Sequence, residues 1–231
     1  MMKLVKLEWK KNKLGKGIRA AGITTAILLA FLMAMAESGE LDGAKTMETY
    51  GKNMLIAAVE LFSHMTYIIF TGVMLASYVV SAYEKRTINL MFSYPIDRRK
   101  ILFSKLLAVW IFNFAAVILT KVIIYVVLFM TSSYTHADTS GIQIGTLSFW
   151  LNLLLSSAAM VSISYIALLV GMKLRSSKAA VITAVIVAAL TQGNIGDFTL
   201  SSSVPFYILL LILAGISVCL SVYNVETSDV L

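Results

Sequence analysis

The chain has 231 residues, of which 59% are hydrophobic and only 13% are charged, and its formal net charge is +7. Soluble domains carry about a quarter charged residues. This composition therefore excludes an ordinary soluble protein and predicts an all-α membrane protein built as one helical bundle. A single cysteine, Cys219, and two histidines far apart in sequence argue against a disulfide framework and against a metal site.

Residues 1–17 form a basic segment with apolar residues on two partial ridges. Leu4, Leu7 and Trp9 belong to these ridges, and lysines lie between them. Such a pattern is typical of a helix in the membrane interface, with lysines near lipid phosphates and tryptophan at headgroup depth. The alternative is a flexible basic tail that only orients the next helix.

The first predicted membrane span is 18–36, close to the roughly 20 residues that cross the hydrocarbon. A secretory signal ending at 34–36 is the rival interpretation, but the apolar core is long for a signal, so we expect the span to be retained. Small residues recur every fourth position and form a stripe that lets another helix approach closely. This stripe consists of Gly22, Ala26, Ala30 and Ala34.

Five further apolar segments complete a prediction of six transmembrane helices within residues 18–231. They are 56–82, 106–130, 147–172, 179–195 and 204–223. The second is too long for one straight crossing, so it is either tilted or has its first turns in the outer interface. The fifth has a short apolar run followed by glycines and polar residues. It predicts a broken or re-entrant element before the last span, or a helix that runs on through Gly196.

Basic residues alternate between the two sides of the predicted spans. Sixteen of the nineteen fall in the segments assigned to the inside, two in the outside loops, and Lys121 in a span. The positive-inside rule then places both termini in the cytoplasm of a multi-pass cell-membrane protein. The basic charge serves orientation and contact with anionic lipid, and we expect no nucleic-acid partner.

Lys121 lies in the outer half of the third span, where a charge is costly. Three interpretations remain open: it snorkels outward, it pairs with Glu60 of the second span, or it lines a translocation path as a fixed positive charge. Glu60 and His64 are four residues apart and share one helix face. The three residues therefore predict a polar patch, which is a candidate translocation path or outer gate.

Motifs of common catalytic sites are absent from the sequence. There is no Walker A pattern, no H-E-x-x-H and no G-x-S-x-G. We expect no catalytic residue, no metal and no cofactor bound by this chain. An intramembrane enzyme built from His64 and the serines of the fourth span, or a membrane scaffold that moves nothing, are the rival classes.

The polar stretch 83–107 lies between the second and third spans on the inside. Its first half can continue as a helix that displays apolar side chains, and Pro95 ends that helix because proline forces the preceding residue out of helical geometry. The order is Glu84, then Thr87-Ile88-Asn89-Leu90, then Ser93-Tyr94-Pro95-Ile96-x-Arg98, then Ile101 and Lys105-Leu106-Leu107. This order resembles the permeases of ABC-2-type transporters, except that Arg86 stands where the family often has glycine.

The resemblance implies the permease subunit of an ABC exporter, similar to exporters of antimicrobial, lantibiotic or amphipathic toxin-like peptides. Drugs, sodium or polysaccharide are alternative substrates. It implies a second permease, identical or homologous, and two copies of a separate ABC ATPase that carries the ATP and magnesium. Residues 1–17 would be the connecting helix. The cytoplasmic coupling helix and its flanks would comprise Glu84, Thr87, Ile88, Leu90, Met91, Phe92, Pro95 and Arg98.

Overall fold

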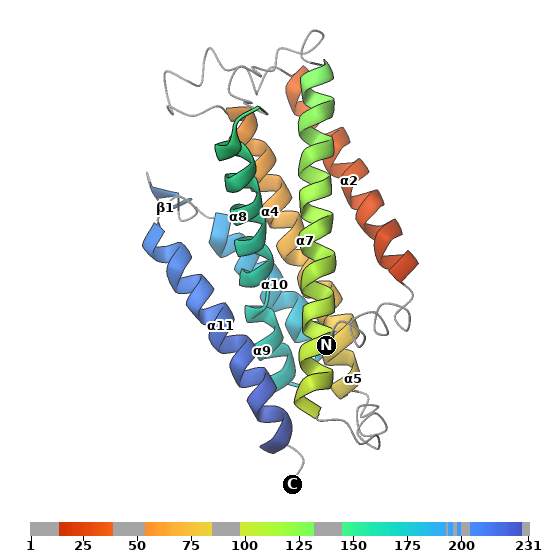
Figure 1. Ribbon diagram of the computed structural model, residues 1–231, viewed down its shortest axis with the longest axis vertical. Coiled ribbons are helices and arrows are strands. Elements are labelled where there is room, and N and C mark those ends of the chain that lie inside the picture. The colour runs from red at the N-terminus through yellow and green to blue at the C-terminus, as the bar shows by residue number, and fades with distance from the viewer. Residues whose placement is uncertain are drawn as a thin grey trace. The chain divides into compact units, whose positions relative to one another are not determined.

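The computed structural model describes residues 14–38, 54–84, 98–131, 145–192, 194–195, 198–199 and 204–227 (Figure 1). These residues are helical apart from turns and one short hairpin, which confirms the all-α prediction. The helices are α2 (Leu14–Glu37), α4 (Met54–Leu75), η1 (Ala76–Val80), α5 (Ser81–Glu84), α7 (Arg98–Thr131), α8 (Leu147–Ile163), α9 (Ile166–Lys173), α10 (Ser177–Gln192) and α11 (Val204–Thr227).

Four helical stretches among the described residues are long and apolar enough to cross a membrane. They are Gly15–Glu37, Leu55–Glu84, Lys100–Thr131 and Leu147–Lys173. Two shorter apolar helices are Ser177–Gln192 and Ile208–Val222. Helices suit these sequences because hydrocarbon offers no hydrogen bonds, so each segment must satisfy its own backbone. A multi-pass membrane protein follows, while the full count of six spans stays a prediction.

The region after α10 differs from one of the two sequence predictions. Helix α10 ends at Gln192, and strand β1 (Asn194–Ile195) pairs antiparallel with β2 (Phe198–Thr199). The expectation that the helix runs on through Gly196 is therefore wrong. A hairpin satisfies backbone groups locally where glycine and polar residues make a continuous helix unfavourable. The expected re-entrant path of this segment stays a prediction.

Two helical stretches contain local irregularities. The predicted span 56–82 includes the π-helical turns of η1, a form that appears mostly as short insertions in α-helices. A turn separates α8 from α9, and hydrogen bonds at Tyr165 tie it to two other helices. The Ser217 hydroxyl donates to the Tyr165 carbonyl at 2.6 Å, and the Tyr165 hydroxyl donates to the Leu106 carbonyl at 2.7 Å.

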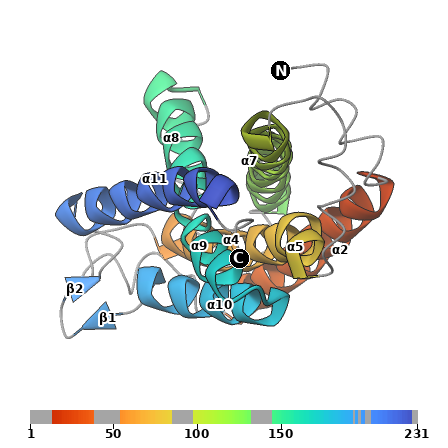
Figure 2. The ribbon, with the colours of Figure 1, turned by 90° about the horizontal axis from the view of Figure 1, so that it is seen from below.

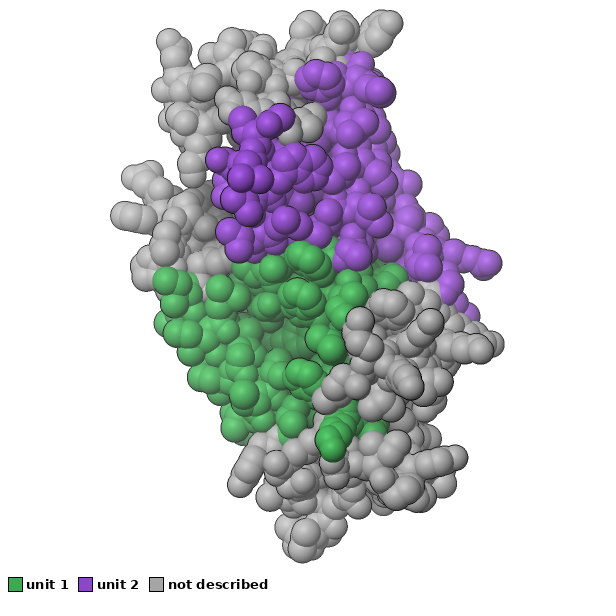
Figure 3. Space-filling model, in the orientation of Figure 1, with its two compact units in different colours: residues 1–14, 65–114, 158–231 green, residues 15–64, 115–157 purple. Residues whose placement is uncertain are grey.

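The chain divides into two compact units, coloured separately in Figure 3. Unit 1 comprises Met1–Leu14, Met65–Phe114 and Ala158–Leu231, and unit 2 comprises Gly15–His64 and Ala115–Ser157. Helices α4, α7 and α8 contribute residues to both units. Each unit has its own core and its own polar contacts.

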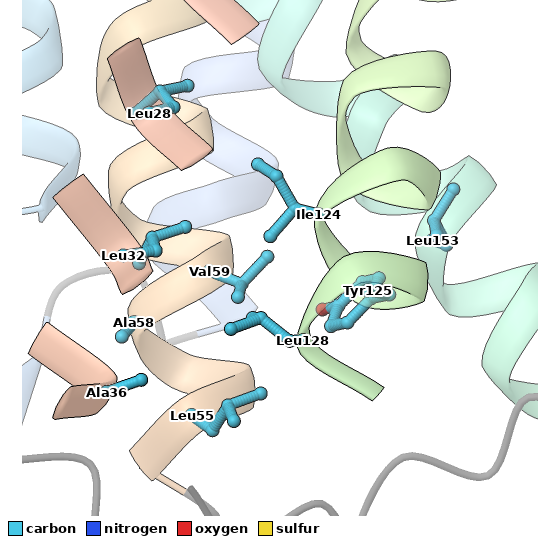
Figure 4. Packing of buried hydrophobic residues seen from close by; sticks show 10 residues of the cluster. All are labelled: Leu28, Leu32, Ala36, Leu55, Ala58, Val59, Ile124, Tyr125, Leu128 and Leu153. Carbon is cyan, nitrogen blue, oxygen red and sulfur yellow. The ribbon is translucent and has the colours of Figure 1, made fainter. Parts of the chain in front are cut away.

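The core of unit 2 is an apolar cluster built from four helices (Figure 4). Helix α2 contributes residues at a spacing of four, which lie on one face of a helix. The labelled members are Leu28, Leu32, Ala36, Leu55, Ala58, Val59, Ile124, Tyr125, Leu128 and Leu153. Helix α2 thus packs within the chain through the face that carries Leu28, Leu32 and Ala36, which we call its leucine face.

The core of unit 1 includes a close approach of helices at glycine positions. A Cβ added to Gly171 of α9 would lie 2.6 Å from the Cβ of Ala180 in α10 and 3.0 Å from Val80 of η1. A Cβ at Gly72 would likewise collide with Ala184 of α10. Figure 2 shows α9 and α10 side by side. Small residues on both sides allow this contact, as is common between membrane helices.

Candidate functional site

Lys121 is a fully buried charged residue in the second half of α7, with 0% of its side chain exposed. It belongs to unit 2 together with Glu60 and His64 of α4 and Ser156 of α8. We call these four residues the Lys121 cluster. The sequence predicted a polar patch of Lys121, Glu60 and His64, and the structure brings all three together.

The ammonium group of Lys121 lies within hydrogen-bond distance of three side chains. Nζ is 3.2 Å from Oε1 of Glu60, 2.8 Å from Nε2 of His64 and 3.1 Å from Oγ of Ser156. An ammonium has three protons to donate and no acceptor. With Lys121 charged, Nε2 of His64 therefore accepts a hydrogen bond. The three contacts together use all three protons of the Lys121 ammonium.

Pairing with Glu60 is the interpretation of Lys121 that the structure supports. Snorkelling to an interface does not fit a fully buried side chain whose donors are all directed inward. Glu60 itself remains 38% exposed at its side chain, so the ion pair has one buried and one accessible partner. The accessible charge of the cluster is consequently the carboxylate and not the ammonium.

The chemical abilities of the cluster follow from this pairing. A serine next to a lysine can form a nucleophile and base, and Ser156 is 3.1 Å from Lys121. That chemistry needs a neutral amine, whereas an ammonium paired with Glu60 has no free electron pair to take the serine proton. The described residues also contain no group of three His, Cys, Asp or Glu side chains that could hold a metal ion. The arrangement suits charge recognition.

Glu84, at the end of α5 in unit 1, makes a second set of polar contacts. Its Oε2 accepts a hydrogen bond of 2.6 Å from the Ser177 hydroxyl and one of 3.2 Å from the Ser177 backbone N–H. Ser177 is the first residue of α10, where backbone N–H groups lack intrahelical partners. A carboxylate at this end also interacts favourably with the helix dipole. Glu84 therefore caps α10.

The turn that precedes the cap is a Schellman motif. Ser176 N–H donates to the Gly171 carbonyl at 3.1 Å, and Arg175 N–H donates to the Met172 carbonyl at 3.2 Å. Arg175 has a φ of 47°, in the left-handed region that usually holds glycine. The turn reverses the chain between α9 and α10 and sets Ser177 within reach of Glu84.

Most of the predicted coupling residues lie outside the described residues. These are Thr87, Ile88, Leu90, Met91, Phe92 and Pro95. The same holds for Leu4, Leu7 and Trp9 of the predicted connecting helix 1–17. Arg98 begins α7, ahead of the predicted span 106–130, but the structure describes only its backbone. Of the coupling set, Glu84 alone has described side-chain contacts.

The small-residue stripe of α2 lies on the surface of the described chain. Its members Gly22, Ala26, Ala30 and Ala34 are all exposed, and a Cβ added at Gly22 would meet nothing within 4 Å. The helices of unit 2 contact the opposite leucine face instead. Close approach of another helix to the stripe therefore stays a prediction.

Two serines in these sites were not predicted from the sequence in the contacts that the structure gives them. Ser156 stands in a serine- and alanine-rich span where serines most often bond their own backbone, and it does lie 3.2 Å from the Leu153 carbonyl. Ser177 carried a usable signal, because serine just before an apolar helical run is a common start of a helix. Nothing in the sequence indicated its partner Glu84.

Comparisons with known proteins agree over most of the chain. Residues 4–191 match the family described as ABC-2 family transporter protein. A relative from Bacillus subtilis (strain 168), named uncharacterized protein YcbO, is 27% identical over 204 residues, which cover 88% of this chain and 89% of the relative. No solved structure matches.

Proposed function

The chain belongs to the ABC-2 transporter family, and we propose that it is the permease subunit of an ABC exporter for hydrophobic or amphipathic peptides. The observation that carries this proposal is the family match over residues 4–191, in a chain whose described helices include four candidate membrane spans. Membership of the family makes the chain a membrane transport subunit and implies an ABC ATPase as its partner in general terms.

The proposed assembly holds two permeases, identical or homologous, and two ATPase subunits that bind the ATP and magnesium. The apolar segments predict six spans, and the distribution of basic residues would then place both termini in the cytoplasm of a cell-membrane protein. ATP-driven closure of the ATPase dimer would displace the segment 85–97, and the bundle would re-pack between inward- and outward-facing states. The chain itself would contribute no catalytic residue.

The substrate class is proposed from the physical character of the chain. Its described surface is largely apolar, and its spans contain few charges, which suits a hydrophobic or amphipathic cargo better than a bare ion. Toxin-like peptides have this character. Export of drugs, sodium or polysaccharide is distinguished from peptide export by a panel in which each of these substrates is offered in the vesicle assay described next.

The proposal is tested with inside-out vesicles that contain the chain and a co-expressed ABC ATPase. We expect fluorescent amphipathic peptides to accumulate in the vesicles only with ATP and magnesium, and vanadate to abolish the accumulation. The matched control replaces the catalytic glutamate of the ATPase and leaves this chain unchanged. If no ABC ATPase associates with the chain and no member of the panel accumulates, the proposal is wrong.

A further inference from the structure

The Lys121 cluster offers a hydrogen-bond acceptor to a ligand, because the Lys121 ammonium has no proton left to donate. All three ammonium protons are directed at Glu60, His64 and Ser156. Among the described residues, the hydrogen bonds of the Glu60 carboxylate with Lys121 and Ser156 both end on Oε1. A carboxylate has two oxygens with about four lone-pair sites. Oε2 of this partly exposed side chain therefore has capacity for a further donor.

The surface around Glu60 combines polar and apolar groups. Asn152 is exposed on α8, four residues before Ser156, so the two lie on the same helix face. Leu61 follows Glu60 along α4 and Leu155 precedes Ser156 along α8, and both are exposed apolar side chains. A carboxylate facing hydrocarbon alone is unfavourable in a membrane span. This face is suited to a molecule that joins a hydrogen-bond donor to an apolar chain.

We propose that Glu60, with Asn152 and Ser156 beside it, forms a binding site for the ammonium group of a cationic amphiphile. Oε2 of Glu60 accepts an N–H from the ammonium, the amide and hydroxyl supply further polar contacts, and the leucines contact the apolar portion. Lys121 holds the carboxylate in place from behind. The ammonium can come from a transported amphipathic amine or peptide, or from the headgroup of a lipid such as phosphatidylethanolamine.

The role of this site in substrate selection rests on the proposed export function, but the binding itself does not. Binding is measured on the purified chain without an ATPase. Failure of the wild-type chain to bind the amine, with ATP-driven peptide transport intact, would refute the site alone. Amine binding by a chain that never transports anything would refute the export function alone.

The experiment uses the full chain in nanodiscs of phosphatidylcholine, whose headgroup has no N–H. The probe is monodansyl diaminododecane, which carries a free ammonium, and its N-acetyl derivative is the uncharged control. Dansyl emission is titrated, and the signal of empty nanodiscs is subtracted. The variants are Glu60→Gln and, as a control for the loss of one acidic charge, Glu37→Gln at the exposed end of α2.

We expect Glu60→Gln to weaken binding of the amine by about ten- to hundredfold, the range for a hydrogen bond to a charged group. Glu60→Gln should change binding of the N-acetyl probe by less than about twofold. Glu37→Gln should change binding of the amine by less than about twofold. Equal amine affinity of wild type and Glu60→Gln would overturn the proposal and would point to a second protein chain as the neighbour of this face.

Two further variants protect the test against a failure of folding. Glu60→Gln combined with Lys121→Met removes both charges and should bind the amine as weakly as the single change. Lys121→Met alone keeps the carboxylate and removes a nearby positive charge, so it should bind the amine at least as tightly as wild type; weaker binding would show that the Glu60 carboxylate does not recognise the amine and would overturn the proposal. Phosphatidylethanolamine added to the nanodiscs weakens probe binding if a lipid ammonium occupies the site, and leaves it unchanged if the ligand is a soluble amine.

Discussion

Two glutamates in this chain use their carboxylates in opposite ways. Glu60 in unit 2 neutralises a lysine with 0% exposure, so the pair compensates a charge that has no access to water. Glu84 in unit 1 is exposed and binds the first residue of α10 through two hydrogen bonds. The Glu60 interaction is required because Lys121 is buried. The Glu84 interaction adds modestly to the stability of a helix that would form without it. Burial of the partner, more than the number of bonds, sets the expected cost of removing each acid.

The largest effect is expected from Glu60→Ala. This change leaves the Lys121 ammonium buried without a counter-charge, which costs about 3–5 kcal/mol when one partner of a buried pair is removed. We expect the free energy of unfolding, measured by titration with SDS in mixed micelles, to fall by that amount.

Lys121→Met is the matched control for this prediction. It removes the buried charge, fills a similar volume and leaves Glu60 partly exposed, so we expect a loss of less than about 1.5 kcal/mol. If the two variants lose equal stability, the asymmetry between the buried and the accessible partner does not hold.

The next largest loss of stability is expected when a side chain is added at the close helix contact of unit 1. Gly171→Leu places a side chain where a Cβ alone would already lie 2.6 Å from Ala180. Overpacking of this kind costs about 1–3 kcal/mol. The loss should appear in the same unfolding titration.

Gly215→Leu in α11 is the comparison, since a Cβ there meets nothing within 4 Å. It should leave stability unchanged or raise it slightly, because leucine favours helix more than glycine by close to 1 kcal/mol. An equal loss in both variants would mean that the α9–α10 contact is not the cause.

Glu84→Ala should have a smaller effect on stability and a larger one on coupling. Loss of a carboxylate at a helix N-terminus costs about 0.3–1 kcal/mol. The first turn of α10 should then exchange its amide hydrogens faster, while α11 remains unaffected. If α10 moves together with the segment that follows Glu84, ATP-driven uptake should fall although the ATPase still associates.

The outcome of Ser177→Ala decides between two roles of Glu84. This variant removes the hydroxyl partner and leaves Glu84 available to another subunit. Reduced uptake in both variants indicates that the link to α10 matters. Reduced uptake in Glu84→Ala alone indicates that Glu84 contacts the ATPase directly, as the family resemblance implies.

Sequence reasoning was most successful where one physical requirement dominated. Long apolar runs had to become helices in lipid, and the predicted span 147–172 nearly coincides with the observed stretch 147–173. A lysine in a membrane span needed a counter-charge, which left Glu60 as a named candidate. The first inference depends on the local sequence alone, whereas the second follows from the cost of an unpaired charge in a membrane span.

The parts that the sequence did not predict depend on contacts between distant residues. The turn at Tyr165 has no proline or glycine to announce it, and it is held by Ser217 and Leu106 from other helices. The stripe at Gly22 signals that close approach is possible but not which helix approaches. The cap on α10 needed knowledge that Glu84 and Ser177 meet, 93 residues apart in the chain.

The last prediction concerns the turn that brings Ser177 to Glu84, and here the expected change in stability has the opposite sign. Arg175 adopts a φ of 47°, a left-handed conformation in which a side chain is unfavourable and glycine is not. Arg175→Gly should therefore stabilise unit 1 by about 0.5–1 kcal/mol, somewhat offset by the greater freedom of glycine in the unfolded chain. The control is Arg175→Lys, which keeps the charge and the Cβ and should leave stability unchanged. If Arg175→Gly destabilises the protein, the arginine side chain must contribute more to this turn than the strain in its backbone costs.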